Sequence, residues 1–207
     1  MQVILINGSP NREGCTYTAL SIIEDELNAA GIETQMFQLG TEAIAGCRDC
    51  GYCFEHGTCA IGDIVNEFTE LATDADGFIF GSPVHYASAG GSITAFMDRV
   101  FFSARRRVFR GKPAAAVVSC RRGGSTAALD QLGKYFAISQ MPVVSSQYWN
   151  MIHGMSPDEV RQDLEGVQIM RTLGKNMAWL LRCINAGKAA GIELPLSERV
   201  TFTNFIR

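Results

Sequence analysis

Short apolar runs alternate with longer amphipathic segments along most of this chain, and this alternation limits the possible folds more than any other feature. Five runs have the length and composition of buried strands, at residues 3–6, 35–37, 77–80, 114–119 and 143–145. Apolar positions repeat at helical spacing in residues 16–30, 64–72, 92–102 and 126–139. Strands that are each followed by a helix form a parallel sheet with helices on both faces. The sequence therefore predicts an α/β fold around five parallel strands.

No internal repeat, low-complexity stretch or linker divides the 207 residues, a length that suits a single domain. We therefore expect one domain over residues 1–207. Its C-terminal segment, residues 156–207, is expected to contain one long amphipathic helix over about residues 157–190. The apolar positions of that helix suit the core or a subunit interface, and the tail after it is expected to pack on a neighbouring subunit.

Charge and hydropathy exclude several classes of partner. The formal net charge of -3 gives no basic surface for a nucleic acid. No apolar run approaches the roughly 18 residues that would span a membrane. The first residues lead directly into a strand pattern without the features of a signal peptide. A cytoplasmic protein is expected, in which the seven cysteines remain thiols unless they bind metal.

The loop after the first strand has the composition of a phosphate site. Residues 4–20, ILINGSPNREGCTYTAL, pass from a strand into a helix, and in an open parallel sheet this loop borders the ligand crevice. Unpaired amides and the helix dipole attract an anion there, and Gly8 and Gly14 allow the backbone to curl closely. The candidate hydroxyl donors are Ser9, Thr16, Tyr17 and Thr18. The alternative is an ordinary turn in which Thr16 caps the helix.

The spacing in this loop selects among phosphate compounds. A nucleoside-triphosphate loop requires GxxxxGK[ST], but five residues separate Gly8 from Gly14 here, and Cys15 stands where the lysine would be. The dinucleotide fingerprint GxGxxG is also absent from the stretch. A single phosphate held by neutral donors fits best, and the leading candidate is FMN.

Two further loops follow strands and are expected at the same edge of the sheet. In residues 80–100, FGSPVHYASAGGSITAFMDRV, a stiff and partly aromatic wall suited to a flat isoalloxazine ring is formed by Pro83, Val84, His85 and Tyr86. A structural role is the alternative for His85 and Tyr86. In residues 118–129, VSCRRGGSTAAL, the residues brought to this edge are Cys120, Arg121, Arg122 and Gly123. The two guanidinium groups are expected either to face a flavin or a nicotinamide phosphate, or to be solvated.

Four of the seven cysteines fall within CRDCGYCFEHGTC, in a loop over residues 46–60. Core packing usually scatters cysteines, so this clustering indicates metal or redox chemistry. The run places Cys47, Cys50, Cys53 and Cys59 as CxxCxxCx5C. Tetrahedral zinc commonly uses two separated CxxC pairs, whereas three closely spaced cysteines and one further on favour a [4Fe-4S] cluster. Metal-free thiols, zinc and redox cycling remain open alternatives.

These motifs resemble the NADPH-dependent FMN reductase family, and most closely its iron-sulfur flavoprotein branch. The segments that carry the resemblance are GSPNREGCT, GSPVHYASAGGSITAFMDR and the cysteine run. The resemblance covers about residues 1–129. The resemblance implies a flavodoxin-like, doubly wound sheet of order 2-1-3-4-5 and a homodimer or homotetramer. It implies phosphate contacts at Ser9, Asn11, Gly14, Thr16 and Tyr17, ring contacts at residues 83–86, and cluster ligands at the four cysteines. Many members have Asn or His in place of Cys15, where this chain would offer its backbone amide.

The family implies an oxidoreductase in which FMN takes hydride from NADPH or NADH. The electrons would then pass to a small-molecule acceptor or through an iron-sulfur cluster. Because the flavin carries the chemistry, no catalytic acid or base is expected. The run RRRVFR at residues 105–110 could hold a 2'-phosphate, face solvent or contact another subunit. The alternative function is an electron carrier that is reduced by ferredoxin-like redox proteins, and a third reading is a flavin-free zinc-binding module.

Overall fold

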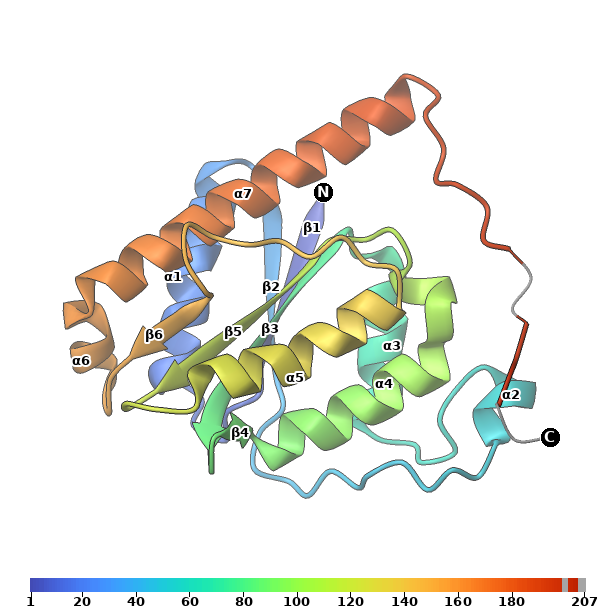
Figure 1. Ribbon diagram of the computed structural model, residues 1–207, viewed down its shortest axis with the longest axis horizontal. Coiled ribbons are helices and arrows are strands. Elements are labelled where there is room, and N and C mark those ends of the chain that lie inside the picture. The colour runs from blue at the N-terminus through green and yellow to red at the C-terminus, as the bar shows by residue number, and fades with distance from the viewer. Residues whose placement is uncertain (199–200, 205–207) are drawn as a thin grey trace.

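The computed structural model describes residues 1–198 and 201–204, with the backbone alone for residues 105–107. Strands and helices alternate along the chain (Figure 1). The strands are β1 (Gln2–Asn7), β2 (Glu33–Gln38), β3 (Gly77–His85), β4 (Ser88–Ala89), β5 (Ala114–Cys120) and β6 (Met151–His153). The helices are α1 (Cys15–Ala29), α2 (Tyr52–His56), α3 (Ile64–Asp74), α4 (Gly91–Phe109), α5 (Ser125–Ile138), α6 (Pro157–Gln162) and α7 (Leu164–Ala189).

The main sheet has the order β2-β1-β3-β5-β6, with β4 attached to β3 as a short antiparallel hairpin. All neighbours in that order pair in parallel. When the hairpin strand is set aside, this is the order 2-1-3-4-5, and the predicted fold class is confirmed. The chain crosses to opposite sides after β1 and after β3, so the loops that follow these strands border the crevice where such sheets bind ligands.

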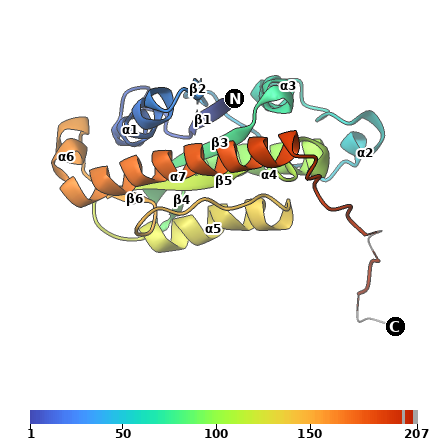
Figure 2. The ribbon, with the colours of Figure 1, turned by 90° about the horizontal axis from the view of Figure 1, so that it is seen from above.

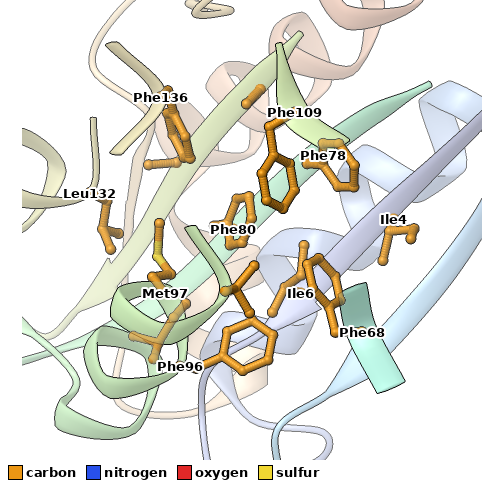
Figure 3. Close-up of a cluster of buried hydrophobic side chains, with 14 of the residues drawn as sticks. Ile4, Ile6, Phe68, Phe78, Phe80, Phe96, Met97, Phe109, Leu132 and Phe136 are labelled. Carbon is orange, nitrogen blue, oxygen red and sulfur yellow. The ribbon is translucent and has the colours of Figure 1, made fainter. Parts of the chain in front are cut away.

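The sheet is apolar on both faces because helices cover both (Figure 2). Successive residues of a strand point to opposite faces, and β1 shows the consequence. Ile4 and Ile6 join a core cluster with residues of α3, α4 and α5, whereas Val3 and Leu5 join a second cluster with residues of α1 and α7. Figure 3 shows the first cluster, which is rich in phenylalanine. Two covered faces explain why the strands read as continuous apolar runs.

The fifth strand lies later in the chain than residues 143–145, where it was predicted. Val143 makes only an isolated bridge to Ala114, and β6 at Met151–His153 pairs with the end of β5 instead. The cause is Asn150, whose side chain donates to the carbonyl of Val144 at 3.3 Å and accepts from the amide of Ser146 at 3.2 Å. These bonds close a loop between the two contacts with β5.

The predicted C-terminal helix is two helices, α6 and α7. Asp163 separates them, and its carboxylate accepts the Gly166 amide at 3.0 Å and so caps α7. The same carboxylate accepts the amide of His153 at 2.8 Å, which ties the break to β6. None of the helices in the described ranges is both long and apolar enough to cross a membrane.

The C-terminal tail leaves the end of α7 and extends away from the body of the protein (Figures 1 and 2). Its first part is held by Arg110, whose guanidinium donates to the carbonyl of Pro195 and to Gln140. Packing of the tail on another subunit stays a prediction. In the RRRVFR run, the side chains of residues 105–107 lie outside the part that the structure describes.

Candidate functional site

The loop between β1 and α1 is shaped by hydrogen bonds from two buried or partly buried amide side chains. Asn7, at the end of β1, accepts the Ser9 amide at 3.1 Å and donates to Gln38 at 2.6 Å. Gln38 in turn donates to the carbonyl of Ser9 at 2.7 Å, and Ser9 Oγ accepts the amide of Asn11 at 3.1 Å. The loop therefore holds its curl before any ligand arrives. Sequence reasoning missed Asn7 and Gln38, although a polar residue closing an apolar strand was a usable signal.

Gly8 brings this loop against the neighbouring strand. Its amide donates to the carbonyl of Gly81 at 2.9 Å. A Cβ at Gly8 would lie 2.6 Å from the side chain of Ile93 and 2.7 Å from that carbonyl oxygen. Because real Cβ atoms do not approach so closely, this position requires glycine, and the loop after β1 lies directly beside β3.

The first turn of α1 presents amides without a side-chain cap. The N-cap is Gly14, which makes no side-chain cap bond, and the first turn contains no acidic residue. The first amides of a helix lack partners within the helix and carry the positive end of its dipole. Those of Cys15, Thr16 and Tyr17 stand beside the curled loop. This arrangement can bind one phosphate group.

The side chains at the start of α1 serve different roles. Thr16 is buried, and its hydroxyl lies 2.8 Å from Ser119 Oγ at the end of β5. Thr18 donates to the carbonyl of Gly14 at 3.1 Å, so its hydroxyl is used inside the helix. The thiol of Cys15 points to the carbonyl of Gly154 at 3.7 Å, and burial, aided by the charge of Glu159, raises its pKa. Cys15 therefore offers the site its backbone amide.

The loop after β3 is a hairpin with a strained tip. Tyr86 and Ala87 have φ of 51° and 58°, and Tyr86 is fully exposed. A left-handed residue other than glycine costs about 1–2 kcal/mol, so neighbouring contacts must fix this shape. Gln131 of α5 supplies them, since its Oε1 accepts from Ser88 Oγ at 2.7 Å and from the Ala89 amide at 3.0 Å. The segment from Pro83 to Tyr86 thus forms a fixed wall at the edge of the sheet.

The loop after β5 packs against this hairpin. Arg121 and Arg122 are exposed, whereas Cys120 is buried and burial raises its pKa. Gly124 has φ of 93°, and a Cβ there would lie 2.5 Å from the Cα of Ala87. The three loops that sequence reasoning assigned to one edge do meet: Gly8 contacts β3, Thr16 contacts the end of β5, and Gly124 contacts the hairpin.

Replacing Gly124 with Ala is expected to lower the free energy of unfolding by about 1–3 kcal/mol, since the methyl group would be forced into the hairpin backbone. Gly123 provides the matched control, because a Cβ there meets nothing within 4 Å and its φ is not left-handed. Urea unfolding of both variants measures the difference. Equal stabilities would contradict the close packing of the two loops.

All four cysteines of the run line one pocket, which lies against α4. The pocket has a volume of about 160 Å³, and its other lining residues include Arg48, Ile61, Arg99, Phe102 and Ser103. Cys47 and Cys50 are exposed, Cys59 is partly buried, and Cys53 on α2 is buried. Within residues 1–198 and 201–204, no three His, Cys, Asp or Glu side chains are gathered closely enough to hold a metal ion. The cysteines share a pocket but are not assembled as a ligand set.

A buried arginine on α4 joins this pocket to the fold. Arg99 is 1 % exposed, and its Nη1 and Nη2 donate to the Asp63 carboxylate at 2.7 and 2.8 Å. Burial opposes the charge of each group, but their mutual hydrogen bonds outweigh it, so the pKa of Asp63 is lowered and that of Arg99 is raised. The guanidinium also donates to Cys59 Sγ from Nε at 3.3 Å and from Nη2 at 3.2 Å. Sequence reasoning missed Arg99 and Asp63.

The cysteine pocket lies apart from the edge of the sheet where the loops after β1, β3 and β5 meet, which we call the three-loop edge. In Figures 1 and 2, α2 lies well apart from the β4 hairpin. Helix α4 connects the two regions: Gly91 follows the hairpin directly, and Arg99 lies eight residues further along the helix. At 1.5 Å per residue this is about 12 Å along the axis.

Comparison with known proteins shows which protein family, sequences and solved structures this chain is similar to. The sequence pattern of the NADPH-dependent FMN reductase family matches residues 1–155. An iron-sulfur flavoprotein of Methanocaldococcus jannaschii is 33% identical, with 89% of this chain and 99% of that protein covered. One of Archaeoglobus fulgidus is 30% identical, with coverage of 86% and 96%. Among solved structures, an NAD(P)H:quinone oxidoreductase from Methanothermobacter marburgensis aligns with a TM-score of 0.65 at 18% identity, covering 86% of this chain and 96% of that one.

Proposed function

Because the chain belongs to the NADPH-dependent FMN reductase family, we propose that it is an oxidoreductase whose bound FMN takes hydride from NADPH or NADH. The observation that carries the proposal is the uncapped first turn of α1 beside a preformed loop. A site of this kind suits one phosphate held by neutral donors. FMN has one phosphate and would supply the hydride and electron chemistry.

The three loops would contact different parts of FMN. The phosphate would be held by Ser9, Asn11, Gly14, the amide of Cys15, Thr16 and Tyr17. The wall formed by Pro83, Val84, His85 and Tyr86 would support the ring, with Cys120, Arg121, Arg122 and Gly123 along its other edge. Hydride transfer requires reacting atoms about 3–3.5 Å apart. A hairpin that Gln131 fixes would keep its shape when a nicotinamide stacks on the flavin.

We also propose that the cysteine pocket holds a [4Fe-4S] cluster, with Cys47, Cys50, Cys53 and Cys59 as ligands. Thiolates are the ligands that such clusters require. The pocket collects all four side chains around one space, and two relatives are named iron-sulfur flavoproteins. Zinc, redox-active thiols and metal-free thiols are the competing occupants, and metal and sulfide analysis of the anaerobically prepared protein separates them.

The proposed electron acceptor is a small molecule or a redox protein, with no role for nucleic acid or membrane. A cytoplasmic homodimer or homotetramer is proposed from the family resemblance and from the exposed apolar side chains of the tail, among them Leu196 and Phe202. Light scattering of the purified protein at several concentrations tests the assembly.

Rapid mixing with NADPH under nitrogen tests the reductase proposal. We expect flavin absorbance to bleach within the turnover time measured with an artificial acceptor, because the open side of the ring would admit a nicotinamide. The second candidate is an electron carrier, because a cluster in addition to a flavin would pass single electrons, and two relatives are named iron-sulfur flavoproteins. Absence of bleaching by NADPH or NADH, together with rapid reduction by a ferredoxin, would replace the reductase by the carrier.

A further inference from the structure

We propose that Arg99 is a positioning residue for Cys59 that also raises the reduction potential of the bound cluster. This inference rests on the proposed cluster and extends it, since it assigns a role to a side chain outside the ligand set. In the described structure the hydrogen bonds of the Arg99 side chain go to the cysteine loop and Asp63, and none of them goes to the three-loop edge.

The sulfur of Cys59 is fixed by two donors of one rigid group. Nε and Nη2 of Arg99 lie 3.3 and 3.2 Å from Cys59 Sγ. A thiol sulfur is a weak acceptor, whereas a thiolate bound to iron carries negative charge and accepts more strongly. Asn66 fixes the backbone of the same residue: it accepts the Cys59 amide at 3.1 Å and donates to its carbonyl at 3.0 Å. Cys59 is therefore held at both its backbone and its sulfur.

The same guanidinium fastens both ends of the cysteine loop. Nη1 donates to the carbonyl of Ala45, before the first cysteine, at 3.4 Å. Nη2 donates to the carbonyl of Ile61, after the last cysteine, at 3.1 Å. Cys47 and Cys50, between these anchors, are exposed. One end of the ligand set is thus placed by α4 before metal arrives.

The charge of Arg99 acts where water cannot screen it. The side chain is 1 % exposed, so its field at Cys59 is stronger than that of a surface cation. Reduction adds one electron to a cluster that already carries negative charge, and a neighbouring cation with hydrogen bonds to sulfur favours the reduced state. Asp63 opposes this effect from the neighbouring edge of the guanidinium, where it accepts from Nη1 and Nη2, and its side chain is 29% exposed. Removing Arg99 and neutralising Asp63 should therefore shift the potential in opposite directions.

The test compares Arg99→Gln with Asp63→Asn in the FMN-loaded, cluster-reconstituted protein. EPR-monitored redox titration measures the midpoint potential of the cluster separately from that of the flavin. We expect Arg99→Gln to lower the potential and Asp63→Asn to raise it, each by about a tenfold change in the one-electron equilibrium, or about 59 mV. Asn at position 63 can still cap α3 and still accept from Arg99. Arg110→Gln, which removes a partly buried charge directly after the same helix, is the control and should leave the potential unchanged.

A purely structural anchor would give a different result. It would leave the potential of the retained cluster unchanged in both variants, and that result overturns the inference. If Arg99→Gln cannot hold a cluster, Arg99→Lys replaces it, because lysine keeps the positive charge but lacks the planar set of guanidinium donors. The direction in which Asp63→Asn shifts the potential still decides whether the charge of Arg99 acts on the cluster. If the wild-type protein takes up no iron and sulfide, the proposed cluster itself is wrong. If the wild type holds a cluster and the two variants have its midpoint potential, only the proposed role of Arg99 is wrong.

Discussion

Replacing Cys50 with Ala is expected to abolish the brown colour and the roughly four irons and four sulfides per chain that the proposed cluster would give the anaerobically prepared protein. The reason is that Cys50 lines the pocket where the four thiols would wrap one cluster. FMN content should stay at the wild-type level, because the loop between β1 and α1 and the β4 hairpin lie away from α2 (Figure 1), whose Cys53 lines this pocket. Iron, acid-labile sulfide and released flavin are measured on one sample.

Cys183→Ala is the matched control for this experiment. Cys183 is an exposed cysteine of α7 and is not among the residues that line the pocket. Its replacement should leave iron, sulfide and flavin unchanged. A wild-type protein that is purely yellow and holds no iron after reconstitution would contradict the cluster assignment. One zinc per chain would instead indicate a zinc site. The flavin proposal survives both outcomes.

Replacing Thr16 with Val is expected to weaken FMN binding by about ten- to a hundredfold. The substitution preserves shape while removing a donor, and loss of a hydrogen bond to a charged group costs about 1.5–3 kcal/mol. The hydroxyl of Thr16 is paired with Ser119 Oγ, and either oxygen can be the donor. When Ser119 donates, the hydrogen of Thr16 is available for a phosphate oxygen. Titration of the apoprotein with FMN, followed by the quenching of flavin fluorescence, measures the affinity.

Ser119→Ala separates the phosphate contact from the contact between loops. This change removes the partner of Thr16 but leaves the Thr16 hydroxyl as a donor, so FMN affinity should fall much less than in Thr16→Val. Urea unfolding of both variants reports the loss of the Thr16–Ser119 bond. Equal losses of stability in the two variants, with unchanged FMN affinity in both, would show that the Thr16 hydroxyl serves only Ser119.

The fold was predictable because both faces of the sheet are covered. Full burial makes the strand at residues 77–80 continuously apolar, and the helical pattern that follows each strand indicates a parallel crossover. The fifth strand was misplaced because residues 143–145 are as strand-like as residues 151–153. The choice between them depends on the side chain of Asn150, which closes the loop that separates them.

The candidate site was predictable to the level of loops but not of contacts. The roles of glycines, hydroxyls and cysteines can be inferred from residue type and spacing alone. The role of Arg99 instead depends on which face of α4 is buried and on which residues pack against that face. Asp63 and Cys59 come from a loop whose path no periodicity predicts. The left-handed conformation of the hairpin tip was not predictable either, because Tyr86 and Ala87 are not residue types that favour it.

The bond between Thr16 and Ser119 joins residues 103 positions apart. Thr16 lies on α1, which follows β1, and Ser119 lies on β5, and the sheet places β1 and β5 on either side of β3. The three-loop edge therefore exists only when the central strands are assembled, and an unfolded chain offers a ligand no comparable surface. A ligand that binds the native state alone shifts the unfolding equilibrium by mass action, by about 2.7 kcal/mol at a free concentration one hundred times its Kd. Cofactor supply would then set how long each molecule survives against unfolding and proteolysis.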